Sequence, residues 1–246
     1  MLPAAGPTPL VRVHLAQVPA RLRDAALPPA ALLPTERARV DRAAPADRSA
    51  VATSLLLART AAAAACGLPV EDVRVDRRCP RCGATTHGVP RVRRRDDGPV
   101  PFLSLSRCAD LVLVAMSTIG PLGVDLERAD ADPGAATARV ALAPGEPPAD
   151  GHDPLRTWVR KEAVLKAAGT GLAVDPRTLR VSDAAGGPVV GGAAPRPPDG
   201  TRWWLVDLDL GPTHRRTHLG ALAAAVPPGP VPAVELVTSR RVAVSG

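Results

Sequence analysis

Hydrophobic and polar positions alternate along several short segments, and this pattern predicts β-strands. Residues 11–15 and 102–106 alternate between hydrophobic and polar side chains, which is typical of strands with one buried face. Residues 111–116 form an uninterrupted hydrophobic run, as expected for a strand buried on both faces. Further strands are predicted at 71–75, 123–127, 203–208 and 219–226.

Two stretches have the periodicity of amphipathic helices. The first covers residues 48–66, with Asp47 as a plausible N-cap and Gly67 at its end. The second covers residues 155–168 and is closed by Gly169. Strand–helix–strand order therefore occurs once before and once after residue 127. We expect an α/β (α+β) fold with two similar subdomains, 1–127 and 128–246.

The remaining segments read as loops. Proline and glycine are frequent around residues 28–34, in 132–153 and in 186–200, and these stretches show no clear periodicity. Arg91, Arg93, Arg94 and Arg95 form a basic run that we expect to lie in a solvated loop.

Composition and charge narrow the function classes. The 246 residues are 46% hydrophobic, which excludes a disordered chain, and only 2% aromatic, which argues against base-stacking surfaces for nucleic acid. The net charge of +7 favours anionic partners. A transmembrane helix and a secretory signal are not expected, and four cysteines do not form a disulfide scaffold. We therefore expect a cytoplasmic protein, without membrane or nucleic-acid partners.

Only two of the 31 basic residues are lysines, and both fall in the second predicted helix. Trp158, Glu162 and Lys166 are spaced by four residues, so they share one ridge of that helix. An exposed Glu–Lys pair would give the same pattern. Arginine would serve such a pair equally well, however, so Lys161 and Lys166 indicate a need for compact ammonium groups.

Asp125 and Glu127 are two residues apart on a predicted strand and therefore project from the same face. Carboxylates in such a pair repel each other unless a cation lies between them, and carboxylate oxygens are common Mg²⁺ ligands. The alternative is a solvated strand end.

Residues 104–107, Ser-Leu-Ser-Arg, combine two hydroxyl groups on one strand face with a guanidinium. Nothing marks Ser104 or Ser106 as a nucleophile, because no Gly-x-Ser-x-Gly elbow is present. A hydroxyl group beside Arg107 could instead bind a phosphate.

Cys79 and Cys82 have the spacing of a zinc knuckle, with His87 nearby as a third candidate ligand. A fourth ligand would have to come from Cys66 or Cys108, which are distant in the sequence. The other interpretation is a reduced cysteine pair that stabilises a tight turn.

Three motifs together resemble the surfactin-synthetase type of 4'-phosphopantetheinyl transferase, in the holo-carrier-protein synthase superfamily. They are Ser-Leu-Ser-Arg at 104–107, Gly-Val-Asp-Leu-Glu at 123–127, and Trp-x-x-Lys-Glu-Ala-x-x-Lys-x-x-Gly-x-Gly-Leu at 158–172. The upstream segments 36–39 and 79–90 are also similar to members of this family, so the resemblance spans roughly residues 30–175. It implies two α/β subdomains related by a pseudo-two-fold axis, with CoA bound in a cleft between them.

The resemblance also implies an activity. A monomeric enzyme would transfer 4'-phosphopantetheine from CoA to a serine of an apo acyl or peptidyl carrier protein, in polyketide or nonribosomal peptide biosynthesis, and release 3',5'-ADP. Asp125, Glu127 and Glu162 would hold Mg²⁺, or Mn²⁺ in its place. Glu162 would also help to deprotonate the serine, and Lys166 would neutralise the pyrophosphate. The expected CoA-binding residues are Arg42, Arg48, Ser106, Arg107, Lys161 and Lys166.

Two positions depart from the family pattern. Arg107 stands where the family usually has His, and Val89 stands where many members have Lys. An inactive family member that binds carrier protein is therefore one alternative. A basic nucleic-acid-binding protein with a zinc knuckle is the other.

Overall fold

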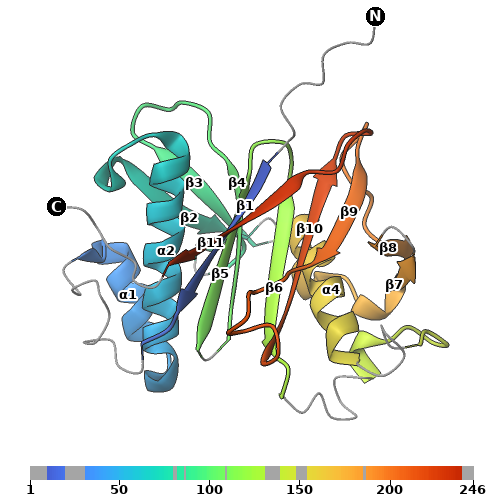
Figure 1. Cartoon of the computed structure of the whole chain (residues 1–246). Helices are drawn as coiled ribbons and strands as arrows, with labels where there is room; N and C mark the ends of the chain where they lie inside the picture. The colour runs from blue at the N-terminus through green and yellow to red at the C-terminus, as the bar shows by residue number, and fades with distance from the viewer. Residues whose placement is uncertain are drawn as a thin grey trace, which may run out of the picture.

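The computed structural model describes residues 10–19, 31–79, 82–85, 87–108, 110–130, 139–147, 154–184 and 187–239. It has a mixed α/β fold with several small sheets and a few helices (Figure 1). The α-helices are α1 (Pro34–Arg42), α2 (Arg48–Cys66) and α4 (Pro154–Ala167). The strands are β1 (Leu10–Gln17), β2 (Val73–Arg78), β3 (Val89–Arg94), β4 (Phe102–Arg107), β5 (Leu111–Ser117), β6 (Leu122–Arg128), β7 (Leu179–Ala184), β8 (Gly187–Gly192), β9 (Arg202–Asp207), β10 (His218–Val226) and β11 (Ala233–Ser239).

Two sheets form the centre of the molecule. The first has the order β11-β1-β5-β4, in which β1 pairs with β11 in parallel and with β5 antiparallel. The second has the order β6-β10-β9 and is antiparallel throughout. β2–β3 and β7–β8 form separate two-stranded antiparallel ladders.

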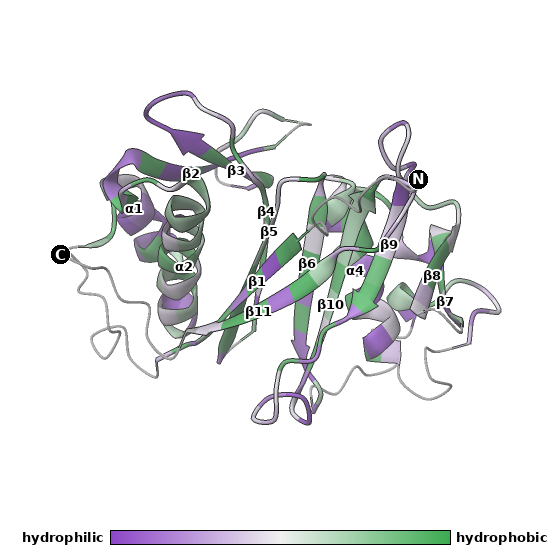
Figure 2. Ribbon diagram, turned by 45° about the horizontal axis from the view of Figure 1, so that its top comes forward, coloured by the Kyte–Doolittle hydropathy of each residue, from purple (hydrophilic) through white to green (hydrophobic). Residues whose placement is uncertain are grey.

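The hydrophobic residues pack in three successive layers. α2 covers one face of the first sheet, and α4 covers one face of the second (Figure 1). Alternate positions of β5 face opposite ways: Leu113 packs in the core between the sheets, and Val114 packs beneath α2. In β10, likewise, Leu222 faces the central core and Ala221 faces α4. Hydrophobic colouring is accordingly dense on α2 and on the central strands (Figure 2).

α2 is a core helix, although the stretch Pro45–Cys66 is long and apolar enough to cross a membrane. Of its most apolar window, 67% is buried inside the protein. Its one internal charge, Arg59, is 4% exposed and donates to Glu36 of α1 at 3.1 Å. This buried ion pair attaches α1 to α2. The helix ends as predicted at Gly67, whose φ of +65° favours glycine.

Several segments predicted to be loops have regular structure. The basic run lies largely in β3, where Val92 is buried against α2 while the neighbouring arginines point outward. β8 lies within the Gly/Pro-rich stretch 186–200, and α1, β7 and β11 were not predicted. The predicted strand 71–75 begins instead at Val73, after a 3-10 turn at Val70–Asp72.

Asp47 occupies the N-cap position of α2, as predicted. Asp47 closes a 3-10 turn, Pro45–Asp47, and its side chain makes no capping hydrogen bond. The other predicted strands and both predicted helices match described elements to within one or two residues. Much of the predicted loop 132–153 lies outside the described residues.

The order strand, helix, hairpin, strand, strand occurs twice in the chain. β1, α2, β2–β3, β4 and β5 are followed by β6, α4, β7–β8, β9 and β10. The predicted boundary at residue 127 falls at the end of β6. By its pairing with β10, β6 belongs to the sheet of the C-terminal part of the chain. By its pairing with β1, β11 belongs to the sheet of the N-terminal part.

Candidate active site

The two carboxylates of β6 lie on the face of the strand that is directed toward α4. Leu122, Val124 and Leu126 enter the core between the sheets, so Asp125 and Glu127 take the opposite face, as the sequence predicts. Asp125 is only 4% exposed and Glu127 is half-buried. The alternative of a solvated strand end is therefore wrong.

A glycine allows α4 to approach β6 closely. A Cβ atom at Gly123 would lie 2.0 Å from the carbonyl oxygen of Ala163 and 2.4 Å from the backbone nitrogen of Ala167. Both are backbone atoms and cannot move aside cheaply. Gly123 therefore brings the C-terminal turns of α4, with Glu162 and Lys166, against the strand that carries Asp125.

The ammonium of Lys166 reaches across to both neighbouring strands. It donates to Asp125 Oδ1 at 2.6 Å, to the Val124 carbonyl oxygen at 3.2 Å and to Ser106 Oγ at 3.2 Å. Lys166 keeps 27% of its side chain exposed, so the ammonium remains accessible to a ligand.

Burial and mutual repulsion perturb the acidic groups. Burial, assisted by the negative charges of Asp125 and Glu127, raises the pKa of Glu162 to about 7, although Lys166 opposes the shift. The pKa of Glu127 is raised by burial and by Asp125 in the same way. Asp125, Glu127 and Glu162 are therefore close enough for their negative charges to affect one another.

The donor set fits a hard divalent cation. Asp125 Oδ2 and Glu162 Oε1 are buried oxygens without a hydrogen-bond donor. Buried polar atoms normally have partners, so each of these oxygens calls for a cation or a bound water. Carboxylate oxygens are the ligands that Mg²⁺ takes in proteins. Asp125, Glu127 and Glu162 would hold such an ion after a small movement, because their ligand atoms do not all lie within 4.8 Å of one another in this structure.

The two serines of β4 join it to β6. Ser104 Oγ accepts a hydrogen bond from the backbone nitrogen of Val124 at 3.1 Å, and Ser106 Oγ donates to Asp125 Oδ1 at 2.8 Å. Both serines are buried. Ser106 therefore contacts the two groups, Asp125 and Lys166, that face each other across the site.

Guanidinium groups gather on the other side of Ser106. We call Arg39, Arg42, Arg77 and Arg107 the arginine cluster. Burial, with the positive charges of Arg39 and Arg107, lowers the pKa of Arg77 to about 10. The pKa of Arg39 is lowered by burial, then by Arg107 and Arg42. Such crowded cations favour an anion with several charges, such as a phosphate.

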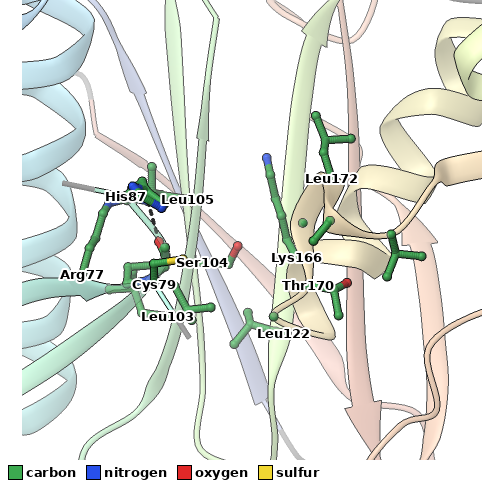
Figure 3. A pocket seen from close by; sticks show the side chains of 17 residues that line it. Arg77, Cys79, His87, Leu103, Ser104, Leu105, Leu122, Lys166, Thr170 and Leu172 are labelled. Atoms are coloured by element: carbon green, nitrogen blue, oxygen red, sulfur yellow. Dashed lines mark hydrogen bonds between the residues drawn. The ribbon is translucent and has the colours of Figure 1, made fainter. Parts of the chain in front are cut away.

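Two cavities meet at Lys166. One, of about 860 Å³, is largely hydrophobic and is lined by residues such as Leu103, Leu122 and Leu172. The other, of about 500 Å³, is more polar and is lined by residues that include Ser106 and Arg107. Arg77, Leu105 and Lys166 border both. In Figure 3, Arg77 and Leu105 lie on one side of the larger cavity, and Lys166, Thr170 and Leu172 lie on the other.

Arg42 and Arg48, which were also predicted to bind CoA, are less directly placed at the site. Arg42 joins the arginine cluster through its charge. Arg48 is exposed and donates to the backbone carbonyl oxygens of Ala43 and Asp41. Neither residue lines the two cavities that meet at Lys166.

Lys161 does not lie at the site, and the prediction that it binds the cofactor is corrected. Its side chain is fully buried and forms an ion pair with Glu146, and its ammonium also donates to the Ala141 carbonyl oxygen at 2.7 Å. Glu146 in turn accepts hydrogen bonds from the backbone nitrogens of Ala143 and Val181. Lys161 therefore fastens the segment before α4 to the helix.

Sequence reasoning missed two members of the arginine cluster. Arg39 was visible in an arginine-rich segment, but only α1 turns it toward Arg107. Arg77 is one of several arginines in β2, and the sequence does not distinguish it from the others. It joins the cluster only because α1, β2 and β4 pack together.

These residues would fit a divalent cation beside a phosphate-bearing ligand, an arrangement used by enzymes that transfer phosphoryl-type groups. Residues 121–204, about a third of the chain, match the model of the 4'-phosphopantetheinyl transferase superfamily (ACPS). This match indicates that the segment forms a 4'-phosphopantetheinyl transferase domain. The matched segment contains Asp125, Glu127, Glu162 and Lys166. A search of curated proteins found no match.

Proposed function

We propose that this enzyme is of the surfactin-synthetase type and transfers 4'-phosphopantetheine from CoA to a serine of an apo acyl or peptidyl carrier protein, with Mg²⁺ and with release of 3',5'-ADP. One observation carries the proposal. Two buried carboxylate oxygens, Asp125 Oδ2 and Glu162 Oε1, have no hydrogen-bond donor, and Asp125 pairs with Lys166, which lines the same cavity as Arg77 and Arg107. A divalent cation and a pyrophosphate together would satisfy all of these charges.

The two cavities correspond to the two ends of CoA. The polar cavity, with Ser106, Arg77 and Arg107, suits the phosphorylated nucleotide. The hydrophobic cavity, with Leu103, Leu105 and Leu122, suits the pantetheine arm. Lys166 lies where the two cavities join, and in this proposal its ammonium contacts the pyrophosphate that links the two ends of CoA.

The residues of this chain then divide the reaction between them. Glu162, in its carboxylate form, accepts the proton of the carrier serine. The serine oxygen attacks the phosphorus atom bonded to pantetheine, and the bond from that phosphorus to the bridging oxygen breaks. This oxygen leaves with 3',5'-ADP, while Lys166 neutralises its developing charge. Bound Mg²⁺ would supply further neutralisation of the pyrophosphate.

The overall organisation and setting follow the same proposal. The repeated order of elements supports two subdomains related by a pseudo-two-fold axis, with CoA between them. We further infer a cytoplasmic, monomeric enzyme that serves polyketide or nonribosomal peptide biosynthesis.

The test is a direct assay of transfer. The full chain is incubated with CoA, Mg²⁺ and a panel of apo carrier proteins, and mass spectrometry and chromatography follow the modified carrier and 3',5'-ADP. Glu162→Gln should lower turnover by at least about 10²-fold, because the general base is lost. Glu235→Gln, an exposed carboxylate on β11, is the matched control and should leave turnover unchanged. Activity retained in Glu162→Gln would show that the site is wrongly assigned, and no product with any carrier would end the proposal.

A further inference from the structure

The loop between β2 and β3 carries three side chains that the transferase reaction leaves unexplained. Cys79, Cys82 and His87 come from a motif compatible with either a zinc site or a reduced cysteine pair. Cys79 and His87 line the hydrophobic cavity, and Figure 3 shows them close to Arg77. Cys79 is half-buried, whereas Cys82 and His87 are exposed.

The ligand atoms are already gathered at the separation that a metal requires. The two Sγ atoms and one imidazole nitrogen all lie within 4.8 Å of one another. Cys82 Sγ is 3.4 Å from His87 Nε2. In a tetrahedral Zn²⁺ site, bonds of about 2.3 Å to sulfur and 2.0–2.1 Å to nitrogen place these two atoms about 3.6 Å apart. The Cys82–His87 separation already matches that geometry, and Cys79 Sγ lies within 4.8 Å of the other two ligand atoms.

The backbone of the loop holds this arrangement. The backbone nitrogen of Gly83 donates to the Cys79 carbonyl oxygen at 2.9 Å, and the nitrogen of Cys79 donates to the Ala84 carbonyl oxygen at 2.8 Å. Gly83 has a φ of +71°, a conformation that favours glycine. The resulting turn brings Cys82 back toward Cys79.

A second glycine brings the histidine to the cysteines. A Cβ atom at Gly88 would lie 2.5 Å from backbone atoms of Arg78 and Cys79. The two arms of the loop therefore touch at this point, and His87 is placed beside the cysteine turn. This contact of Gly88 with Arg78 and Cys79 is an observation separate from the Cys-x-x-Cys spacing, and it supports the same three residues as ligands.

We propose that Cys79 Sγ, Cys82 Sγ and His87 Nε2 bind one Zn²⁺ ion, with a water molecule in the fourth position. Among the residues that the structure describes, no further His, Cys, Asp or Glu joins this group of ligand atoms. Binding releases the two thiol protons. Two thiolates and a neutral imidazole then balance the charge of the ion, so the site can lie beside the guanidinium of Arg77 without repulsion.

The site has a consequence for Arg77. Its Nη1 donates to the carbonyl oxygen of Gly88 at 3.1 Å, and Gly88 directly follows His87. A Zn²⁺ ion that closes the loop would fix this carbonyl group and hence the orientation of Arg77. On the proposed function, His87 and the cysteines then act as positioning residues for the CoA site.

The test measures metal, with no need for CoA. The full chain is purified under reducing conditions, incubated with Zn²⁺, desalted and analysed by elemental mass spectrometry. We expect one Zn²⁺ per chain, lost in Cys79→Ser and Cys82→Ser. Cys66→Ser is the matched control and should keep the metal, because Cys66 lies on α2 near Arg94. Cys108→Ser should also keep it, which separates this site from the group Cys108, Asp110 and His218.

Co²⁺ replacement gives a second readout if a variant fails to fold. In the unmodified chain, Co²⁺ should produce sulfur-to-metal charge-transfer bands and the intense visible bands of tetrahedral coordination. Absence of stoichiometric Zn²⁺ in the reduced chain, or retention of Zn²⁺ in Cys82→Ser, would overturn the proposal. Because neither measurement involves transfer, their failure leaves the proposed function standing, and inactivity toward carriers leaves the metal site standing.

Discussion

Lys161 and Lys166, the only lysines of the chain, lie five residues apart on α4 and perform different tasks. Lys161 is fully buried with Glu146, whereas Lys166 is partly exposed and pairs with Asp125. The sequence predicts that both positions need an ammonium, and in the structure each ammonium pairs with a carboxylate. It could not predict that Lys161 points away from the site, because its partner Glu146 lies in a Pro/Gly-rich segment without periodicity.

Replacing each lysine by methionine should separate these tasks. Lys161→Met leaves Glu146 buried without its cation and should lower the free energy of unfolding by about 3–5 kcal/mol. Lys166→Met should cost less, because Asp125 keeps the hydrogen bond from Ser106, but it should abolish most turnover. Urea denaturation and the transfer assay check both changes. Equal loss of stability in the two variants would contradict the assignment.

The raised pKa of Glu162 makes stability depend on pH. In the unfolded chain the group has its ordinary pKa of 4.5, and in the fold the pKa is about 7. Between these values the folded state binds more protons than the unfolded state, so stability falls as pH rises from about 4.5 to 7. With a chelator present to remove metal ions, Glu162→Gln should abolish this fall in the free energy of unfolding, which we expect to be on the order of 1–3 kcal/mol.

Denaturation curves at several pH values, with chelator and with Mg²⁺, measure this effect. Mg²⁺ should stabilise the unmodified chain most above pH 7, where the Glu162 carboxylate is charged. If the stability of the unmodified chain and that of Glu162→Gln depend on pH in the same way, Glu162 is not the titrating group.

At the level of elements, the close contact between α4 and β6 builds the acidic site. Gly123→Ala should push the helix away from the strand, because the added methyl group meets backbone atoms of Ala163 and Ala167. We expect a loss of about 1–3 kcal/mol in unfolding free energy, typical of overpacking, together with a marked loss of turnover.

A matched glycine is available as the control. Gly191 in β8 has no atom within 4 Å of an added Cβ, so Gly191→Ala should leave stability and turnover nearly unchanged. Thermal denaturation and the transfer assay compare the two variants. Normal turnover in Gly123→Ala would show that the site tolerates a wider separation of α4 from β6.

Elements with strong local periodicity were predictable, and those stabilised by distant partners were not. β5, β6 and α4 show their buried faces in the sequence, which also placed Asp125, Glu127 and Glu162 on facing elements. β3 contains only one fully buried residue, Val92, and so resembled a basic loop. β11 has no fully buried residue among its described side chains and is a strand because β1 offers it an edge.

At the scale of the whole molecule, part of the net charge of +7 is concentrated in the arginine cluster. The arginine cluster combines residues of α1, β2 and β4, which approach one another only in the folded chain. No local sequence pattern reports such convergence. An anionic ligand should therefore be drawn to this side of the two cavities, and its binding should weaken with added salt.

Arg77→Ala should raise the KM for CoA by roughly tenfold or more, as expected for loss of a charge-assisted contact of about 1.5–3 kcal/mol. It should also reduce the dependence of KM on salt. Arg74→Ala, on the exposed face of the same strand, removes equal charge and should change KM little. Steady-state kinetics at two ionic strengths measures both variants. Equal changes in KM for Arg77→Ala and Arg74→Ala would indicate that Arg77 acts only through the overall positive charge and not through a contact with CoA.

The parallel pairing of β1 with β11 joins residues 10–16 to residues 233–239. During synthesis the first of these strands emerges more than two hundred residues before its neighbour, so one edge of the first sheet stays open until residue 239 has left the ribosome. Completion of this sheet is therefore a late, non-local step in the maturation of the enzyme, and the nascent chain must wait for it with an unprotected β-edge.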